Sequence, residues 1–223
     1  MLDVATGSGM MVRFLVDRLA GYDEVVGIDR DATVAPAFAE RFPDDPRIRF
    51  ETMDALEMSF PAGSFDTVSM SHGLCEFTDS GRVAVLHAIR RVTRPGGAMI
   101  INDSPRDQPT EAQLTHVLLH DWWSDVDAHT GVVHLPFQTR TDLVAQLEAL
   151  DLENLRLFDV PDDPRDPLDP EQLSWIDGVI DASLERVIDE PALTARGVEL
   201  RERMHRVGFS LATAQLAVGH VAG

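Results

Sequence analysis

The chain opens with Met1-Leu-Asp-Val-Ala-Thr-Gly-Ser-Gly9, and an amphipathic segment over residues 10–20 follows without a break. The order is an apolar run, a turn that contains Gly7 and Gly9, and then a helix. This order brings backbone N–H groups and a helix N-terminus to the carboxyl end of a strand. The two glycines permit backbone angles that a Cβ disfavours, and they let a ligand approach the main chain. This stretch therefore predicts a nucleotide site in an α/β fold.

The residues after the turn decide between classes of nucleotide. A dinucleotide fingerprint that starts at Gly7 needs a small residue at position 12, where this chain has Val12. A phosphate-binding P-loop ends in Gly-Lys-Ser/Thr, and the chain contains no lysine. We therefore expect a ligand with an adenosine part and little or no phosphate.

Acidic residues follow the next two expected strands. Asp29 ends the apolar run 24–28, about 20 residues after the glycine turn, where a carboxylate can accept hydrogen bonds from both hydroxyls of a ribose. Asp54 follows the strand that begins at residues 48–50, and a side chain there can accept from an adenine amino group. Met53 would flank the ring plane or pack in the core. A turn or helix cap is the alternative role for Asp29.

Two more strands are expected at residues 65–70 and 98–101, separated by a helix over residues 80–92 and a Pro-Gly-Gly stop. Ser71 and His72 follow the first of these strands. Because the carboxyl ends of parallel strands meet at one edge of a sheet, we expect these side chains to face the same crevice as the acidic residues.

The second half of the chain supplies candidate walls for a substrate pocket. The capping box Thr110–Gln113 starts a helix that we expect to run to about Trp123. His116 and His120 lie one turn apart on this helix, a spacing that also suits a metal ion, but no glutamate follows the first histidine as in zinc proteases. We predict no metal site and expect His116, His120 and Trp123 to line the pocket; a solvated or packed helix face is the alternative.

The rest of the chain returns to the sheet through a helical insertion. We expect a helix at residues 141–150 and a strand at 152–160, followed by an acidic, proline-rich linker at 161–170. Two helices at 170–188 and 191–207 come next, and a last strand at 209–221 ends the chain. The two helices would cap the active site or form a dimer interface. We therefore divide the chain into a core (1–160), a linker with a helical insertion (161–207) and a returning strand (208–223).

The charge balance argues against polyanionic partners. The 223 residues include 38 acidic side chains against 19 arginines, a net charge of −19, whereas binding to nucleic acid or an anionic membrane depends on clustered cations. Cys75 is the only cysteine, so we expect neither an intrachain disulfide nor a cysteine-based zinc site. No charged-then-apolar signal pattern precedes the first expected strand, and no apolar run approaches the roughly 18 to 20 residues of a membrane span, so we expect a cytoplasmic protein without membrane insertion.

Five motifs in order carry a family resemblance. They are Leu-Asp-Val-Ala-Thr-Gly-Ser-Gly at 2–9, Val-Gly-Ile-Asp at 26–29, Met-Asp-Ala at 53–55, Phe-Pro-Ala-Gly-Ser-Phe-Asp at 60–66 and Arg-Val-Thr-Arg-Pro-Gly-Gly at 91–97. Together they resemble the class I S-adenosylmethionine-dependent methyltransferases, and within these the branch that includes the ubiquinone/menaquinone C-methyltransferases. The resemblance extends from Met1 to about Asp103.

The resemblance implies a Rossmann-like, seven-stranded, mostly parallel sheet with helices on both faces, and S-adenosylmethionine in the crevice. It implies four sets of contacts: the methionine part with Asp3, Ala5, Thr6, Gly7 and Gly9; the ribose with Asp29; the adenine with Arg30, Met53, Asp54 and Ala55; and the methyl group facing Ser71 and His72. Ala5 stands where many members carry glycine. Members usually also have helices before the first strand, whereas this sequence starts at the strand itself. Either an upstream segment is omitted from it, or the lid comes from elsewhere in the chain or from a second subunit in a homodimer.

The predicted reaction is in-line transfer of the methyl group to a small-molecule acceptor. His72 is the candidate base because the pKa of an unperturbed histidine lies near neutrality, and Glu76 is a weaker candidate that would line the acceptor pocket. A structural role for His72 is the alternative. Two other classes of function stay open. One is a non-catalytic adenosyl-ligand sensor or assembly subunit. The other is a nicotinamide oxidoreductase, although the sole tyrosine, Tyr22, does not belong to a Tyr-x-x-x-Lys pair.

Overall fold

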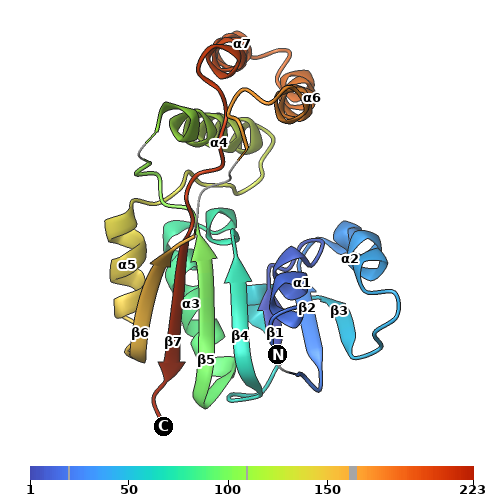
Figure 1. Ribbon diagram of the computed structural model, residues 1–223, viewed down its shortest axis with the longest axis vertical. Helices are drawn as coiled ribbons and strands as arrows, with labels where there is room; N and C mark the ends of the chain where they lie inside the picture. Colours follow the sequence, from blue (N-terminus) through green and yellow to red (C-terminus); the bar gives the residue numbers. More distant parts are fainter. Residues whose placement is uncertain (20, 109, 161–164) are drawn as a thin grey trace.

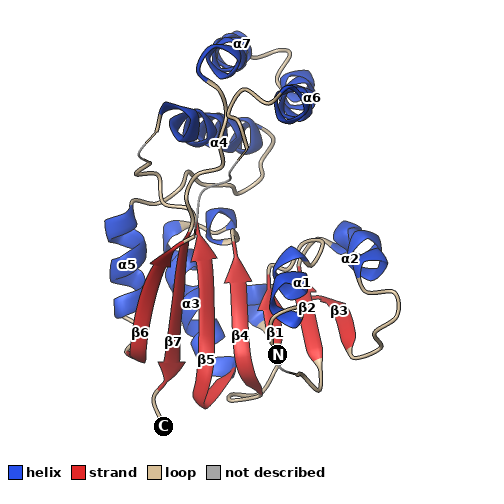
Figure 2. Cartoon of the chain, in the orientation of Figure 1, coloured by secondary structure: helices blue, strands red, loops and turns tan. Residues whose placement is uncertain are grey.

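The computed structural model describes residues 1–19, 21–108, 110–160 and 165–223. Its centre is a seven-stranded sheet in the order β3-β2-β1-β4-β5-β7-β6 (Figures 1 and 2). The strands are β1 Leu2–Val4, β2 Val25–Asp29, β3 Ile48–Thr52, β4 Phe65–Ser71, β5 Thr93–Asp103, β6 Leu152–Asp159 and β7 Gln215–Val221. Strands β1 to β5 pair in parallel, and β7 runs antiparallel to both of its neighbours. The predicted seven-stranded, mostly parallel sheet is confirmed.

Helices cover both faces of this sheet, as predicted. The seven α-helices of the described residues are α1 Met10–Val16, α2 Ala35–Arg41, α3 Asp79–Val92, α4 Glu111–His129, α5 Arg140–Glu148, α6 Pro170–Arg186 and α7 Pro191–Val207. Successive residues of a strand point to opposite faces. On β2, Val25 packs in a cluster with α1 and α2, whereas Val26 packs in the larger core that contains residues of α3 and α5.

A separate helical layer lies beyond the carboxyl ends of strands β4 and β5 (Figure 1). Residues of α4, α6 and α7 form their own buried cluster, with Trp122 fully buried in it. The Trp122 indole N–H donates to the Leu193 carbonyl at 2.9 Å, so α4 is tied to α7 by a polar contact as well as by packing. Helices α6 and α7 follow β6 and precede β7, which confirms the helical insertion. The layer also includes α4, which the sequence-based boundary at residue 160 assigned to the core.

Several element bounds differ from the sequence-based expectation. Helix α1 ends at Val16 instead of continuing toward residue 20. Residue 20, the last of that expected helix, and residues 161–164 of the expected linker lie outside the described residues. Helix α4 continues past Trp123 to His129, because its far end packs in the helical layer. The expected stop at 93–97 lies inside β5 as an irregularity in its pairing with β4. The last strand begins at Gln215 rather than residue 209, because Phe209 packs with the helical layer instead of pairing in the sheet.

Local signals place the helix starts well. The Thr110 hydroxyl accepts the Gln113 N–H at 3.2 Å, as the capping box predicts. Helices α6 and α7 each begin with a proline at the first position, where no backbone N–H donor is needed. Among the described residues, no helix combines the length and apolarity that a membrane crossing requires.

The close approach of α7 to α4 gives a test of the helical layer. A Cβ on Gly197 would lie 2.4 Å from the Trp122 ring, whereas a Cβ on Gly178, in the middle of α6, would have nothing within 4 Å. Gly197→Ala should therefore lower the free energy of unfolding by about 1–3 kcal/mol through overpacking. Gly178→Ala, the matched control, should raise it by about 0.5–1 kcal/mol through helix propensity. Urea denaturation of both variants checks this, and equal effects would contradict the described packing.

Candidate functional site

The loop between β1 and α1 has an unusual backbone. Ala5, Gly7 and Gly9 all have left-handed φ angles, of 52°, 50° and 80°. A Cβ on Gly9 would lie 2.7 Å from the Phe42 ring, so this glycine permits close packing of the loop on α2. A Cβ on Gly7 would meet nothing within 4 Å, so the main chain there stays open to a ligand. For Ala5 the left-handed angle costs about 1–2 kcal/mol, which explains why glycine suits this position better.

Asp3 lies inside the sheet beneath this loop. It is 1% exposed, and its two carboxylate oxygens accept hydrogen bonds from the Thr6 hydroxyl at 2.7 Å and the Ser69 hydroxyl at 2.6 Å. Burial raises the pKa of Asp3 to about 6. The side chain therefore ties β1, β4 and the glycine loop together, and its contact with a methionine amino group stays a prediction.

Asp29 connects the end of β2 to the same loop. One carboxylate oxygen accepts the Gly7 N–H at 2.9 Å, and the other accepts the Asp31 N–H at 2.9 Å. Each oxygen of a carboxylate can accept more than one hydrogen bond, so both keep a lone pair for a further donor. The arrangement suits a ribose diol next to the Gly7 main chain.

A first, narrow cavity lies beside Asp29. It measures about 20 Å³ and is lined by Ala5, Asp29, Arg30, Met53, Asp54, Ala55, Glu76 and Phe77. These include every residue predicted to contact ribose or adenine. The Asp54 carboxylate accepts the Leu56 N–H with one oxygen at 2.8 Å, and its other oxygen has capacity to accept an amino group.

A nucleoside needs more room than this cavity offers, so one side of it must open. The Arg30 guanidinium lies 3.6 Å from the Glu76 carboxylate, and both side chains are about half exposed. An exposed ion pair of this kind contributes little stability, so its separation costs little. The Arg30–Glu76 pair therefore presents little energetic barrier to widening the cavity, and binding of an adenosyl group there stays a prediction.

A second, larger cavity adjoins the first through Glu76, which lines both. It measures about 760 Å³, and we call it the histidine pocket; its lining residues are His72, Cys75, Glu76, Asn102, Ser104, His116, His120, His134, Phe137, Val160, Leu211, Ala212, Thr213 and Ala214. The predicted acceptor residues His72, Glu76, His116 and His120 all lie here. Trp123 does not line it, which corrects that expectation, because this side chain packs against the helical layer.

His72 stands at the end of β4 in a strained backbone conformation, with a φ angle of 53°. Its N–H donates to the Asn102 carbonyl at 2.8 Å, which holds the residue against β5. Its ring nitrogens lie 3.0 Å from the Ser71 hydroxyl and 3.3 Å from the Ser104 hydroxyl. Left-handed angles at residues other than glycine are frequent at functional sites, and this one aims the ring between two hydroxyls.

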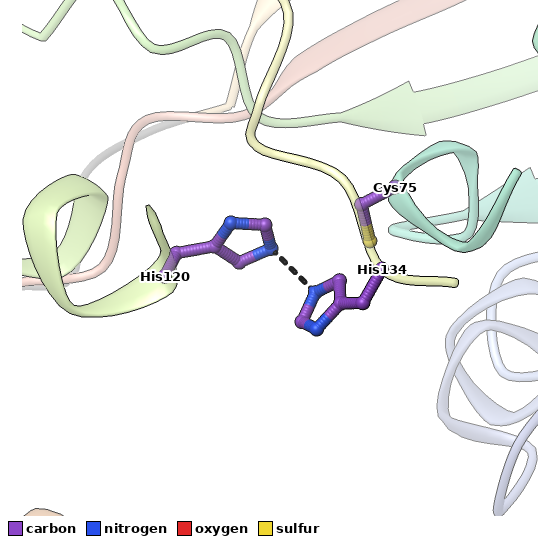
Figure 3. Close-up of side chains that lie close together, drawn as sticks. All are labelled: Cys75, His120 and His134. Carbon is purple, nitrogen blue, oxygen red and sulfur yellow. Dashed lines mark hydrogen bonds between the residues drawn. The ribbon is translucent and has the colours of Figure 1, made fainter. Parts of the chain in front are cut away.

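The pocket histidines of α4 are held neutral by their surroundings. Burial lowers the pKa of His116 to about 4 and that of His120 to about 3. The His116 Nδ1 accepts the Ala212 N–H at 2.8 Å, so it anchors the segment that leads into β7. His120 faces His134, with their Nε2 atoms 3.0 Å apart (Figure 3).

Sequence reasoning gave no role to Cys75 or His134, and it expected no cysteine-based zinc site on the ground that the chain has one cysteine. The structure brings this cysteine close to two histidines. Cys75, His120 and His134 each offer a ligand atom, and these atoms lie within 4.8 Å of one another. The three residues are far apart in the chain, so no local spacing could have revealed the cluster.

Comparisons with known proteins agree with this geometry. Residues 1–97 match the family model described as "Methyltransferase domain". The chain is 37% identical to the demethylmenaquinone methyltransferase of Thermus thermophilus over 47% of this chain and 46% of the relative. It is 30% identical to the 2-phytyl-1,4-naphtoquinone methyltransferase of Synechococcus elongatus over 54% of this chain and 53% of the relative. The chain thus spans about half the length of these curated relatives.

A solved structure supports the fold of the whole chain. A putative methyltransferase from Bacillus halodurans superposes with a TM-score of 0.63 and 16% identity, over 100% of this chain and 92% of that one. The first part of this chain is thus similar to a methyltransferase domain, and the solved structure shows the same fold. The resemblance to the ubiquinone/menaquinone-type methyltransferases is confirmed by the curated relatives.

The raised pKa of Asp3 predicts how stability depends on pH. The folded state holds this proton up to about pH 6, whereas the unfolded chain releases it near the ordinary value of 3.8. Wild-type protein should therefore lose stability relative to Asp3→Asn as the pH rises from about 4 to about 6, by about 3 kcal/mol for a shift of roughly two pKa units.

Chemical denaturation at about pH 4 and about pH 7 measures this change. Asp23→Asn, which neutralises an exposed carboxylate, is the control and should give nearly the same difference at both values. A difference between wild type and Asp3→Asn that does not vary with pH would contradict the buried, protonatable carboxyl group.

Proposed function

We propose that this protein transfers a methyl group from S-adenosylmethionine to a small-molecule acceptor bound in the histidine pocket. One observation carries the proposal: the residues predicted for the nucleoside line one cavity, and that cavity adjoins a pocket of about 760 Å³ through Glu76. The methyltransferase family match over residues 1–97 supports the donor. The adjoining cavities provide a donor side and an acceptor side for a displacement reaction.

The acceptor is determined by the second half of the chain. The two relatives described above are named for quinone substrates, but the family match ends at residue 97. Beyond that residue lie most of the residues that line the histidine pocket. We therefore extend to this chain only the general class, a small molecule, and not the quinone itself.

The chemistry requires alignment more than activation. S-adenosylmethionine supplies a methyl group on a sulfonium, whose leaving group is already activated. The carboxylates of Asp29 and Asp54 bind and orient the nucleoside, and the open Gly7 main chain admits the amino-acid part. His72 is the candidate base: a neutral imidazole keeps one unprotonated nitrogen, which can accept the proton of an acceptor hydroxyl, thiol or amine.

The helical layer serves as the lid in this proposal. Helix α4 brings His116 and His120 to the histidine pocket, and α6 and α7 pack behind it. The homodimer and the cytoplasmic location stay predictions from the sequence; light scattering after size-exclusion chromatography tests the first of these.

The direct test is product release. The protein is incubated with S-adenosylmethionine and a panel of quinols, phenols, thiols and amines, and S-adenosylhomocysteine is quantified. Turnover with at least one acceptor supports the enzyme. Calorimetric binding of S-adenosylhomocysteine without turnover across the panel would favour a sensor, and tight binding of NADH without any response to S-adenosylmethionine would favour an oxidoreductase.

Asp29 and its neighbour Asp31 allow a matched test of the nucleoside site. Asp29→Asn removes a charged acceptor from the ribose position, so S-adenosylhomocysteine should bind about 10–100-fold more weakly, as expected for a hydrogen bond to a charged group. Asp31→Asn removes the same charge from an exposed side chain that caps only the Thr33 N–H, and it should leave affinity nearly unchanged. Titration calorimetry of both variants gives the answer, and equal affinities would reject this ribose site.

His72→Ala separates catalysis from binding. Loss of a general base should lower kcat by about 100-fold or more, while S-adenosylhomocysteine affinity stays within about twofold of wild type. His87→Ala, on the exposed side of α3 and away from the histidine pocket, is the control. Unchanged kcat in His72→Ala would remove this residue as the base.

A further inference from the structure

The wall of the histidine pocket contains a compact set of metal-binding side chains. Cys75 comes from the short 3-10 helix Leu74–Glu76, His120 comes from α4, and His134 comes from the segment after α4 (Figure 3). One ligand atom from each residue lies within 4.8 Å of the others. A thiolate with two imidazoles is a donor set that zinc(II) prefers in proteins.

The two histidines are already arranged as a ligand pair. Their Nε2 atoms are 3.0 Å apart. Two nitrogens on a tetrahedral zinc ion, each about 2.0–2.1 Å from the metal, would be separated by roughly 3.3 Å. The rings therefore need only a small outward shift to place an ion between them. Cys75 Sγ has one weak contact, with the His72 carbonyl at 3.7 Å, and can turn toward the ion.

A carboxylate orients His134 from behind. The Asp127 carboxylate lies 2.7 Å from the His134 Nδ1, so that nitrogen carries the proton and Nε2 presents its lone pair to the cluster. Asp127 is itself held by an ion pair with Arg186 of α6. This chain of carboxylate, histidine and metal position is the usual second shell of zinc sites.

We propose that Cys75, His120 and His134 bind one zinc(II) ion in the wall of the histidine pocket. Structural zinc sites have four protein ligands, whereas catalytic sites have three and keep one position open. All three ligands line the pocket of about 760 Å³, so the fourth position faces the bound acceptor. The site is therefore of the open type.

The ion also narrows the class of acceptor, and this step rests on the proposed methyl transfer. Zinc(II) lowers the pKa of a bound hydroxyl or thiol, so it favours a phenol, an enol or a thiol as acceptor. The acceptor loses its proton to His72 or to solvent as it binds the ion. Its oxygen or sulfur lone pair then forms the bond to the methyl carbon, while the carbon–sulfur bond of the sulfonium breaks and its electron pair stays on the sulfur of S-adenosylhomocysteine.

Metal binding is tested first, without reference to activity. Protein without a histidine tag is treated with a chelator, dialysed, and titrated with Zn²⁺ against a chromogenic chelator and with Co²⁺ by absorption spectroscopy. We expect one equivalent of zinc per chain, and a cobalt complex with the intense visible bands of tetrahedral coordination and a thiolate-to-cobalt charge-transfer band. Failure of the wild-type protein to bind a stoichiometric ion would overturn the proposal.

Variants assign the ligands. Cys75→Ser should abolish the charge-transfer band, and His120→Asn and His134→Gln should each remove stoichiometric binding. Asp127→Asn should weaken affinity by about 10–100-fold through loss of the second shell. His129→Gln removes an exposed histidine from the same helix and should bind like wild type. Circular dichroism confirms folding of each variant, and unchanged binding in Cys75→Ser and His134→Gln would refute this assignment.

Binding and turnover measurements separate this inference from the proposed function. Stoichiometric zinc with no binding of S-adenosylhomocysteine would support the metal site and refute the methyltransferase. For the role of the ion, removal of zinc should lower methyl transfer to phenols or thiols, and added zinc should restore it. Equal turnover with and without the ion would overturn the catalytic role.

Discussion

The hydrogen bond from the Gly7 N–H to the Asp29 carboxylate, 2.9 Å long, is the contact on which the site depends. It joins the loop after β1 to the end of β2, and it holds that loop in left-handed angles that expose the main chain. Asp3 supports the loop from beneath through the Thr6 hydroxyl. Asp3 lies on β1 and Asp29 ends β2, so the sheet fixes this side of the cavity, whereas the opposite side is formed by the exposed Arg30–Glu76 pair.

The proposed methyl transfer divides its site between the two halves of the chain. In this proposal the first half provides the donor site from strand ends and short loops, and this is the part that matches the family model described as "Methyltransferase domain". The second half covers the carboxyl edge of the sheet with α4, α6 and α7 and brings histidines from α4 and the segment after it to the acceptor side. In this proposal a different lid would admit a different acceptor, because the displacement needs alignment rather than a fixed catalytic machinery.

Burial sets the electrostatics of the histidine pocket. The buried environment lowers the pKa of His116 to about 4 and of His120 to about 3, so both side chains stay neutral near pH 7 and present lone pairs rather than charges. Burial also raises the pKa of the Cys75 thiol to about 12. Without an ion the cysteine is therefore a neutral thiol.

The sequence by itself predicted a mostly parallel sheet and the residues that end its strands, because the carboxyl ends of parallel strands converge at one edge whatever the details of packing. For this reason Asp29 and Asp54 could be expected to line one cavity, as they do; their contacts with a nucleoside stay a prediction. Only the tertiary structure decided that Trp123 packs in the helical layer, that β7 starts at Gln215, and that Cys75 meets His120 and His134. These features depend on contacts between segments distant in the chain, for which hydrophobic period and local spacing carry no signal.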